Sequence, residues 1–548
     1  MRNGGKILVD QLRLRGTNSV FCVPGESYLD ILNALYDVPE EIKIYNARHE
    51  AGAANMAEAY GKLTGQPGVA LVTRGPGACH ASVGVHIAYQ DSTPMILIVG
   101  QVSQDNKDRE AFQEIDYKLM FSGIAKWCAQ IDCINRIPEY VNRAFNTALS
   151  GRKGPVVLAV PENILAQEAD TLDYVVSKHT QSAPPKNIIP SLELLFEDCN
   201  KPLILLGGSG WTTCASDQLQ AFALEHDIPV TTSFRRQDLV DNKSRIYCGS
   251  FGTSVSPTLL KRLKEADLLI VLGARMGEMT TQGYQVIRPG NLNQKLVHIH
   301  PDANEIGKVY APTLGINSSV TNIAELLAEI NINKPKRWIA WCKSLRSEHL
   351  FDINPPGYEG NLDLGKIFSD LDKELPENAI VTLDAGNHTG WPQRFLNFSP
   401  RRRQVGSTCG TMGYSIPAAV AASLLYKDRL VVGLVGDGGF MMSGMELTTA
   451  VQYATPLIIL VFNNNSYGTI RMHQEMKYPG RVVATSLVNP NFEAFGIALG
   501  LHSETISRTE DFMPAFRRCL QLKKPCLLAL QIDANQLTSR LFLNEISE

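Results

Sequence analysis

The stretch LVVGLVGDGGFMMSGMELTTAVQYATPLIILVFNNNSYGTI, residues 430–470, decides the fold of this chain. An apolar run at 430–435 leads into a glycine-rich turn at 436–439. A helical pattern from about 443 to 453 is then followed by a second apolar run at 457–462. This pattern predicts a strand, a turn, a helix and a second strand, with the two strands parallel in one sheet.

Two polar side chains follow the two predicted strands. Asp437 lies in the glycine turn, and Asn464 follows the second strand 27 positions later. Because the carboxyl ends of parallel strands open on one edge of a sheet, we expect these side chains to converge. Their oxygens suit Mg²⁺ or Ca²⁺ rather than zinc or copper, and the glycines let backbone N–H groups approach a phosphate. The alternative interpretation of GDGG is a tight turn without a ligand.

GDG followed at this distance by an apolar strand and NN resembles the signature of thiamine diphosphate enzymes. The resemblance implies Mg²⁺ held by Asp437, Asn464 and the backbone carbonyl of Ser466, with the diphosphate anchored through the metal. RHEAGAANMAEAYG, residues 48–61, resembles the family segment whose glutamate hydrogen-bonds the pyrimidine ring of the cofactor. Glu50 is therefore the expected catalytic residue, exchanging a proton with the ring nitrogen. Without the family, a glutamate in the first turn of a helix is an ordinary dipole-favourable residue.

Further motifs resemble the acetolactate (acetohydroxyacid) synthase branch of this family: TRGPGA at 73–78, GQV at 100–102 and AFQE at 111–114. GTMG at 410–413 resembles a motif of the family as a whole. The resemblance implies that the Met412 side chain wedges between the two thiamine rings, although a methionine there could equally be core. His49 and His80 lie near these loops and could be structural histidines. The expected cofactor-binding residues are Asn387, His388, Gly410, Met412, Gly438, Gly439, Tyr467 and Gly468. The expected substrate residues are Glu26, Phe112, Gln113 and His473.

The chain is expected to be an α/β protein with three doubly wound parallel-sheet domains. Its 548 residues, 44% hydrophobic and 20% charged, are typical of a globular protein with several domains. Apolar runs alternate with helical patterns, and proline-bearing linkers, the second holding Lys334-Pro335-Lys336, separate three segments. We expect a pyrimidine-binding domain at 1–170, a central domain at 188–332 and a diphosphate- and Mg²⁺-binding domain at 363–548. The expected strands are 19–23, 42–45, 68–72, 95–99, 156–160, 201–208, 228–232, 266–273, 296–299, 379–383, 430–435, 457–462 and 526–532.

Composition restricts the partners. The net charge of -3 offers no basic footprint for nucleic acid. The sequence shows no signal peptide and no apolar run of transmembrane length, so cytoplasmic residence without a membrane partner is expected. The 11 cysteines form no CxxC pair, which indicates neither a zinc site nor a disulfide framework. The resemblance implies a homodimer or homotetramer acting on a small 2-oxo acid. It leaves open whether FAD is bound and whether a regulatory subunit exists.

The resemblance implies decarboxylation of a 2-oxo acid, pyruvate first, with addition of the two-carbon unit to a second carbonyl. With pyruvate as acceptor the product is 2-acetolactate, as in branched-chain amino acid biosynthesis. Three departures from the synthase pattern leave the acceptor open: Glu26 replaces a glycine of a PGG turn, Pro161-Glu162-Asn163 replaces PKD, and His473 replaces a tryptophan. A simple 2-oxo acid decarboxylase, another carboligase and a non-catalytic paralogue are the alternatives.

Overall fold

The computed structural model describes residues 1–176, 180–290, 292–332, 337–358 and 360–546. The segment Lys334-Pro335-Lys336, expected in the second linker, lies outside these residues. The chain forms two compact units, the first of Met1–Thr180, Ser407–Lys427 and Ser443–Pro456, and the second of Gln181–Gly406, Asp428–Met442 and Leu457–Glu548. No helix among the described residues is long and apolar enough to cross a lipid bilayer.

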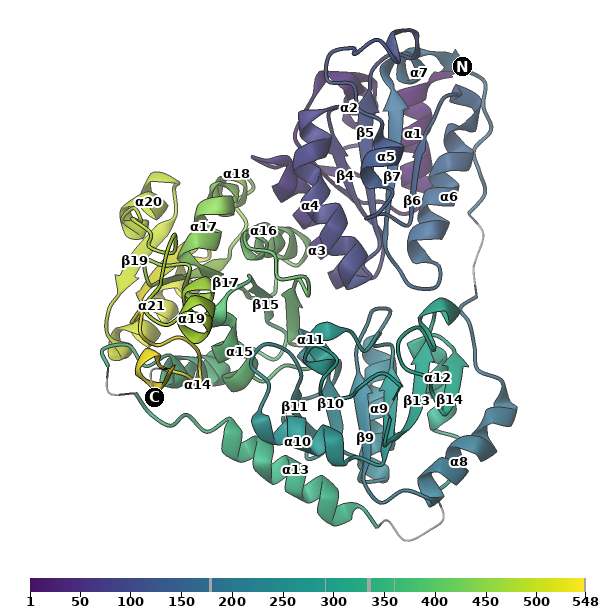
Figure 1. Ribbon diagram of the computed structural model, residues 1–548. Coiled ribbons are helices and arrows are strands. Elements are labelled where there is room, and N and C mark those ends of the chain that lie inside the picture. Colours follow the sequence, from purple (N-terminus) through teal and green to yellow (C-terminus); the bar gives the residue numbers. More distant parts are fainter. Residues whose placement is uncertain (177–179, 291, 333–336, 359, 547–548) are drawn as a thin grey trace. The chain divides into compact units, whose positions relative to one another are not determined.

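A parallel six-stranded sheet in the order β3-β2-β4-β5-β7-β6 forms the centre of the first unit (Figure 1). The apolar residues of one face pack with α1, α2 and α6 into a single core, because the buried strands are apolar along their whole length. The strands are β2 Ser19–Cys22, β3 Lys43–Asn46, β4 Gly68–Val72, β5 Met95–Gln101, β6 Trp127–Gln130 and β7 Pro155–Pro161, and the short pair is β1 Arg2–Asn3 with β8 Glu168–Ala169. The helices are α1 Gly4–Leu14, α2 Leu29–Tyr36, α3 Glu50–Thr64, α4 Pro76–Asp91, α5 Tyr117–Phe121, α6 Ile137–Leu149, α7 Glu162–Ala166, α16 Ser415–Leu425 and α18 Leu447–Gln452.

The second unit contains two further parallel six-stranded sheets, in the orders β11-β10-β9-β12-β13-β14 and β16-β15-β17-β18-β20-β19. The strands are β9 Pro202–Leu206, β10 Val230–Thr232, β11 Tyr247–Ser250, β12 Leu268–Leu272, β13 Lys295–His300, β14 Leu314–Asn317, β15 Ile380–Leu383, β16 Arg403–Gly406, β17 Val431–Gly436, β18 Ile458–Asn463, β19 His502–Ile506 and β20 Cys526–Gln531. The helices are α8 Ile189–Glu197, α9 Thr213–Glu225, α10 Pro257–Glu265, α11 Glu278–Thr281, α12 Val320–Leu327, α13 Ile339–Asp352, α14 Leu364–Glu374, α15 Gly390–Phe395, α17 Asp437–Ser443, α19 Gly468–Lys477, α20 Phe492–Ala498 and α21 Thr509–Leu522.

Each sheet is doubly wound, which confirms the expected fold class. In each one the first long strand lies inside the sheet, and the chain adds strands on one side of it before it crosses to the other. The strand order therefore reverses between β2 and β4, between β9 and β12, and between β15 and β17. Folds of this kind bind ligands at the carboxyl ends of the strands at such a reversal.

Besides the short pair β1 and β8, the structure adds five strands to those expected from the sequence: β6, β11, β14, β16 and β19. All five lie at the edges of the six-stranded sheets. They are short and partly polar, as RQVG in β16 and HSETI in β19 show, because an edge strand has a neighbour on one side only. The glycine turn also differs from expectation, since α17 begins at Asp437 and places Gly438 and Gly439 in its first turn.

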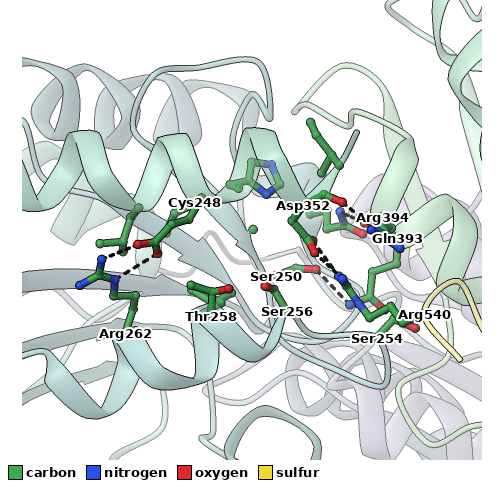
Figure 2. Close-up of a pocket in the computed structure, with 17 residues that line it drawn as sticks. Cys248, Ser250, Ser254, Ser256, Thr258, Arg262, Asp352, Gln393, Arg394 and Arg540 are labelled. Atoms are coloured by element: carbon green, nitrogen blue, oxygen red, sulfur yellow. Dashed lines mark hydrogen bonds and ion pairs between the residues drawn. The ribbon is translucent and has the colours of Figure 1, made fainter. Parts of the chain in front are cut away.

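Helix α13 lies within the stretch expected as the second linker. Trp341 is buried in the core of the central sheet, and its Nε1 donates to the Pro202 carbonyl at 2.9 Å. The last residue of α13, Asp352, forms a bidentate ion pair with Arg540, and the Nε of Arg394 donates to the Asp352 carbonyl at 2.7 Å (Figure 2). These groups line a cavity of about 30 Å³, far below the several hundred Å³ of a typical small-molecule site. We therefore infer that this cluster stabilises the packing of the end of α13 against the segments that carry Arg394 and Arg540.

Replacing Asp352 by alanine tests that role. Arg540 and Arg394 would keep their positive charges in a partly buried cluster without the carboxylate, so we expect a loss of about 2–4 kcal/mol of stability in the second unit. Asp370→Ala is the matched control, because Asp370 pairs with Lys366 and Lys373 on the surface and should cost less than about 1 kcal/mol. The melting temperatures of the two variants measure this difference. Equal falls for Asp352→Ala and Asp370→Ala would contradict the structural role of Asp352.

Candidate active site

Asp437 and the asparagines after β18 lie at the ends of two neighbouring strands. β17 pairs in parallel with β18 up to Gly436 opposite Phe462, so Asp437 and Asn463 leave the sheet together. Asn489 bridges them, because its Nδ2 donates to Asp437 Oδ2 at 2.8 Å and to Asn463 Oδ1 at 2.9 Å. Asn464 follows directly, and its Oδ1 accepts from the Ser466 amide at 3.0 Å. The structure thus brings the predicted ligand segments together and adds Asn489, which the sequence did not single out.

The carboxylate of Asp437 is buried, with 3% of the residue exposed. Burial raises its pKa above the ordinary value, and hydrogen bonds from Asn489 and the Gly438 amide oppose that shift. Nearby, the Oγ of Ser466 is buried without a hydrogen-bond partner among the described residues. A buried acidic oxygen beside amide and carbonyl oxygens is a ligand set that suits a hard divalent cation.

The end of β15 contributes polar groups to the same edge of the sheet. Asn387 accepts from the hydroxyl of Thr469 at 3.0 Å and so faces the start of α19. The His388 ring stacks on Phe462 with centroids 5.1 Å apart, and its Nε2 is buried without a partner among the described residues. Burial, and secondarily Arg235, lower the pKa of His388 to about 3, so the ring stays neutral. A Cβ on Gly439 would collide with the Asp384 carboxylate, which requires glycine there.

Three residues after β18, predicted to bind the cofactor or the substrate, are bonded within the chain or exposed. The amide of Tyr467 donates to the Thr485 carbonyl and that of Gly468 to the Ser466 carbonyl, both at 2.8 Å. These two amides therefore already have partners within the chain, although the second bond fixes the carbonyl expected to bind metal. His473 lies on α19 with its side chain exposed.

In the first unit, Glu50 is the first residue of α3 and follows β3, with His49 as the N-cap residue. Its Oε2 lies 2.9 Å from His80 Nδ1 on α4. A Cβ placed on Gly77 would lie 3.6 Å from Glu50 Oε1, so the TRGPG segment passes beside this carboxylate. The carboxyl group is thus held at the carboxyl edge of the sheet, where the fold keeps its ligands.

Glu446, before α18, holds the backbone that leads into Glu50. Its carboxylate is 2% exposed and accepts from the amides of Arg48 and His49 at 3.0 Å each. Burial raises the pKa of Glu446, and these two amides oppose the rise. A Cβ on Gly52 would collide with this carboxylate, so glycine is required in the first turn of α3. Sequence reasoning missed Glu446, although it lies within the quoted MELTT segment.

The loop that carries Gly410 and Met412 is tied to α3 and α4 by buried carboxylates. The Thr408 amide donates to Asp91 at 2.9 Å, and the Tyr414 hydroxyl donates to Glu58 at 2.6 Å. Lys62 lies between the two carboxylates and pairs with both. Gly410 has φ = +73°, which a side chain adopts with strain, and Met412 is half-buried.

Two of the three departures from the synthase pattern meet at one arginine. Arg74 pairs with Glu162 at 2.9 Å and with Glu26 at 3.2 Å, and its Nε donates to the Phe112 carbonyl at 3.2 Å. The Phe112 side chain itself is 72% exposed. Gln113, with φ = +66°, lines a cavity of about 610 Å³ together with Gln101 and Tyr117, among other residues.

Comparisons with known proteins decide the family. Three family models match: "Thiamine pyrophosphate enzyme, N-terminal TPP binding domain" over residues 2–120, the central domain over 193–328 and the C-terminal TPP binding domain over 384–530. The acetolactate synthase isozyme 2 large subunit of Escherichia coli (strain K12) is 30% identical over 97% of this chain and 96% of its own length.

The chain belongs to the thiamine pyrophosphate enzyme family. It is an enzyme of the thiamine diphosphate-dependent transferase or lyase type, and its N- and C-terminal matches cover the two groups of residues described above. The acetolactate synthase large subunit of Corynebacterium glutamicum is 30% identical over 95% of this chain and 85% of its own length. A putative thiamine pyrophosphate-containing protein of Bacillus subtilis (strain 168) is 28% identical over 97% and 92%. Similarity at this level indicates the cofactor class more firmly than the substrate.

Replacing Glu446 by alanine should destabilise the first unit. Two amides, those of Arg48 and His49, would lose a buried charged acceptor, and we expect a loss of about 3 kcal/mol in stability. Glu139→Ala is the control, because Glu139 pairs with Arg136 at the surface and should cost less than about 1 kcal/mol. The change in melting temperature of the cofactor-free protein measures the effect of each variant. A negligible change for Glu446→Ala would refute the role of Glu446 in holding the backbone before Glu50.

Asp437→Asn should separate cofactor binding from folding. Since burial raises the pKa of Asp437, its ionised form costs stability at neutral pH in the cofactor-free protein, and this cost falls as pH decreases. The asparagine variant should therefore melt at the same temperature or higher without cofactor, while its affinity for Mg²⁺ and thiamine diphosphate falls about a hundredfold or more. Calorimetric titration measures the affinity, and a variant that binds normally would exclude Asp437 as a ligand.

Proposed function

We propose that this chain uses Mg²⁺ and thiamine diphosphate to decarboxylate a 2-oxo acid, with pyruvate as the first candidate. The two-carbon unit then joins a second carbonyl, as in the acetolactate synthase reaction. The observation that carries this proposal is the buried Asp437 carboxylate at the paired ends of β17 and β18. Two relatives that are 30% identical, both acetolactate synthase large subunits, support it.

The residues present fit this cofactor. Asp437, Asn464 and the carbonyl of Ser466 would hold Mg²⁺, which accounts for an acidic group kept buried beside neutral oxygens. The Nε2 of His388, buried without a hydrogen-bond partner among the described residues, suits a diphosphate oxygen. Thiamine diphosphate supplies a nucleophilic ring carbon and an electron sink for the loss of CO₂. We propose that further residues of this chain also bind thiamine diphosphate: Asn387, Gly410, Met412, Gly438, Tyr467 and Gly468.

Glu50 is the proposed catalytic residue. Its Oε2 is engaged by His80, so Oε1 is the oxygen that would hold the proton exchanged with the nitrogen of the pyrimidine ring. In the proposed homodimer or homotetramer, Glu50 serves a cofactor held by the second copy, which is why one chain carries both groups of residues. We propose domain boundaries at 1–170, 188–332 and 363–548.

The substrate end is proposed to involve Glu26, Phe112, Gln113 and His473. Arg74 is bonded to Glu26, Glu162 and the Phe112 carbonyl, so it is not free to receive a substrate carboxylate. One cation between two carboxylates leaves a net negative charge at this edge. That charge repels any 2-oxo acid anion that approaches this edge, and because carboligation to a second 2-oxo acid needs two such anions whereas decarboxylation needs one, a simple decarboxylase is the second candidate function.

The central sheet offers no separate argument for FAD. A Cβ on Gly208 would collide with the Gly273 carbonyl, so these glycines are required by the contact between the loops after β9 and β12. Glycine there needs no flavin to explain it. The visible absorption spectrum of the purified protein, and of the cofactor released by heating, decides whether flavin is bound.

The experiment that tests the function supplies the purified protein with thiamine diphosphate, Mg²⁺ and pyruvate, and follows CO₂, acetolactate and acetaldehyde together. Acetolactate formed in step with CO₂, and lost by about a hundredfold or more in Glu50→Gln, is the expected result. CO₂ with acetaldehyde and no acetolactate would establish the decarboxylase instead. No CO₂ from pyruvate or from a panel of 2-oxo acids, with cofactor bound, would refute both and favour a non-catalytic paralogue.

The variant Glu26→Gly then tests the charge at the substrate end. Glycine removes one carboxylate from Arg74 and frees one face of the guanidinium group. We expect the ratio of acetolactate to acetaldehyde to rise about tenfold, as loss of one nearby like charge predicts. Glu40→Gly, in the exposed segment before β3, is the charge-matched control and should leave the ratio unchanged.

A further inference from the structure

Two histidines, His49 and His80, flank Glu50 in the first unit, and the proposed function gives neither of them a catalytic role. His80 Nδ1 lies 2.9 Å from Glu50 Oε2, and the rings of His49 and His80 are 4.4 Å apart with planes inclined by 31°. One nitrogen or oxygen atom of each of the three side chains lies within 4.8 Å of those of the other two. Three groups that can carry protons are thus in contact at one end of α3.

Solvent exposure increases from the Glu50 side chain to that of His80. The Glu50 side chain is 14% exposed and that of His80 is 48% exposed. His80 therefore connects a largely buried carboxyl group to solvent. His80 thus has one ring nitrogen on the carboxylate and a half-exposed ring.

His49 differs from His80 in its bonding. Its Nδ1 accepts the Ala51 amide at 3.1 Å and caps α3, so the capping bond requires that nitrogen to be unprotonated. The cluster therefore gives the two rings different tasks, with His49 as a neutral cap and His80 as the ring that faces the carboxylate.

We infer that His80 is a positioning residue that acts through Glu50 and relays its proton to and from water. This rests on the proposed function. In the forward direction, Glu50 gives the proton on Oε1 to the pyrimidine nitrogen, and its Oε2 takes the proton of His80 Nδ1. Water gives a proton to His80 Nε2 and leaves hydroxide in the solvent. Glu50 and His80 then carry the same charges as before, with their protons on Oε2 and Nε2, and the reverse sequence restores Oε1 and Nδ1.

The relay makes a prediction about variants that keep or lose the contact. Asparagine at position 80 places an amide near the position of Nδ1, so it can hold Glu50 Oε2 but cannot relay a proton. Alanine removes both functions and leaves space for a small molecule. His86→Asn, on the same helix α4, is the matched control.

The first measurement is the rate at which the C2 proton of bound thiamine diphosphate exchanges with deuterium, together with cofactor affinity from calorimetric titration. We expect exchange to slow at least about tenfold in His80→Asn and His80→Ala, with affinity within about twofold of wild type, as the loss of one proton-transfer group predicts. Added imidazole should restore exchange in His80→Ala in proportion to its concentration. His86→Asn should behave as wild type.

Three outcomes would overturn the inference. Exchange at the wild-type rate in His80→Asn would show that the ring is not needed. Slow exchange without rescue by imidazole, accompanied by weaker cofactor binding, would assign His80 a structural role only. A wild-type protein that does not bind thiamine diphosphate, or exchanges its C2 proton no faster than the free cofactor, would refute the proposed function and the relay with it. If His80→Asn does not fold, His80→Ala with and without added imidazole carries the test.

Discussion

The buried carboxylate of Asp437 is the constraint on which the C-terminal group of site residues depends. Removing a carboxylate from water costs free energy that two or three hydrogen bonds only partly offset, as its raised pKa reflects. The fold accepts this cost at the start of α17, where strand, helix and neighbouring strand leave little freedom to move the side chain. Asn489 ties it to Asn463, and Gly439 allows the chain to pass against Asp384. A cation placed there would stabilise the arrangement as well as serve the chemistry.

The interior of each sheet could be predicted from the sequence, and most of its borders could not. Central parallel strands such as β4 and β18 are buried on both faces and are therefore continuous apolar runs. Edge strands such as β11 and β14 are defined by pairing with one neighbour, which local sequence does not reveal. Helix α13 was hidden for a related reason, because its stretch of sequence is flanked by prolines and its apolar residues, such as Trp341, are spaced irregularly. Its place is fixed by contact with residues far away in the chain.

The site shows the same division. Asp437, Asn464 and Glu50 stand out because each follows a recognisable strand within a spaced motif. Asn489 and Glu446 hold those segments, yet each is an ordinary polar residue whose partners lie dozens or hundreds of positions away. Glu446 leaves a trace in a distant part of the sequence, since Gly52 lies where the carboxylate needs room. A residue that positions a site through tertiary contacts is therefore indicated mainly by the residue types required around it in space.

The departures from the synthase pattern are coupled through Arg74. Taken separately, Glu26 and Glu162 each place a carboxylate near the proposed substrate end, and both would repel a 2-oxo acid. Bonded to one guanidinium group, they instead form a bridge that also holds the Phe112 carbonyl, so a change at one position alters the charge balance and the backbone together. Substrate choice at this edge is then a property of the bridge as a whole. A single replacement that restores a synthase residue leaves Arg74 paired with the other carboxylate alone, and a second replacement would leave the guanidinium group with no carboxylate at this bridge, so the second should matter more once the first has been made.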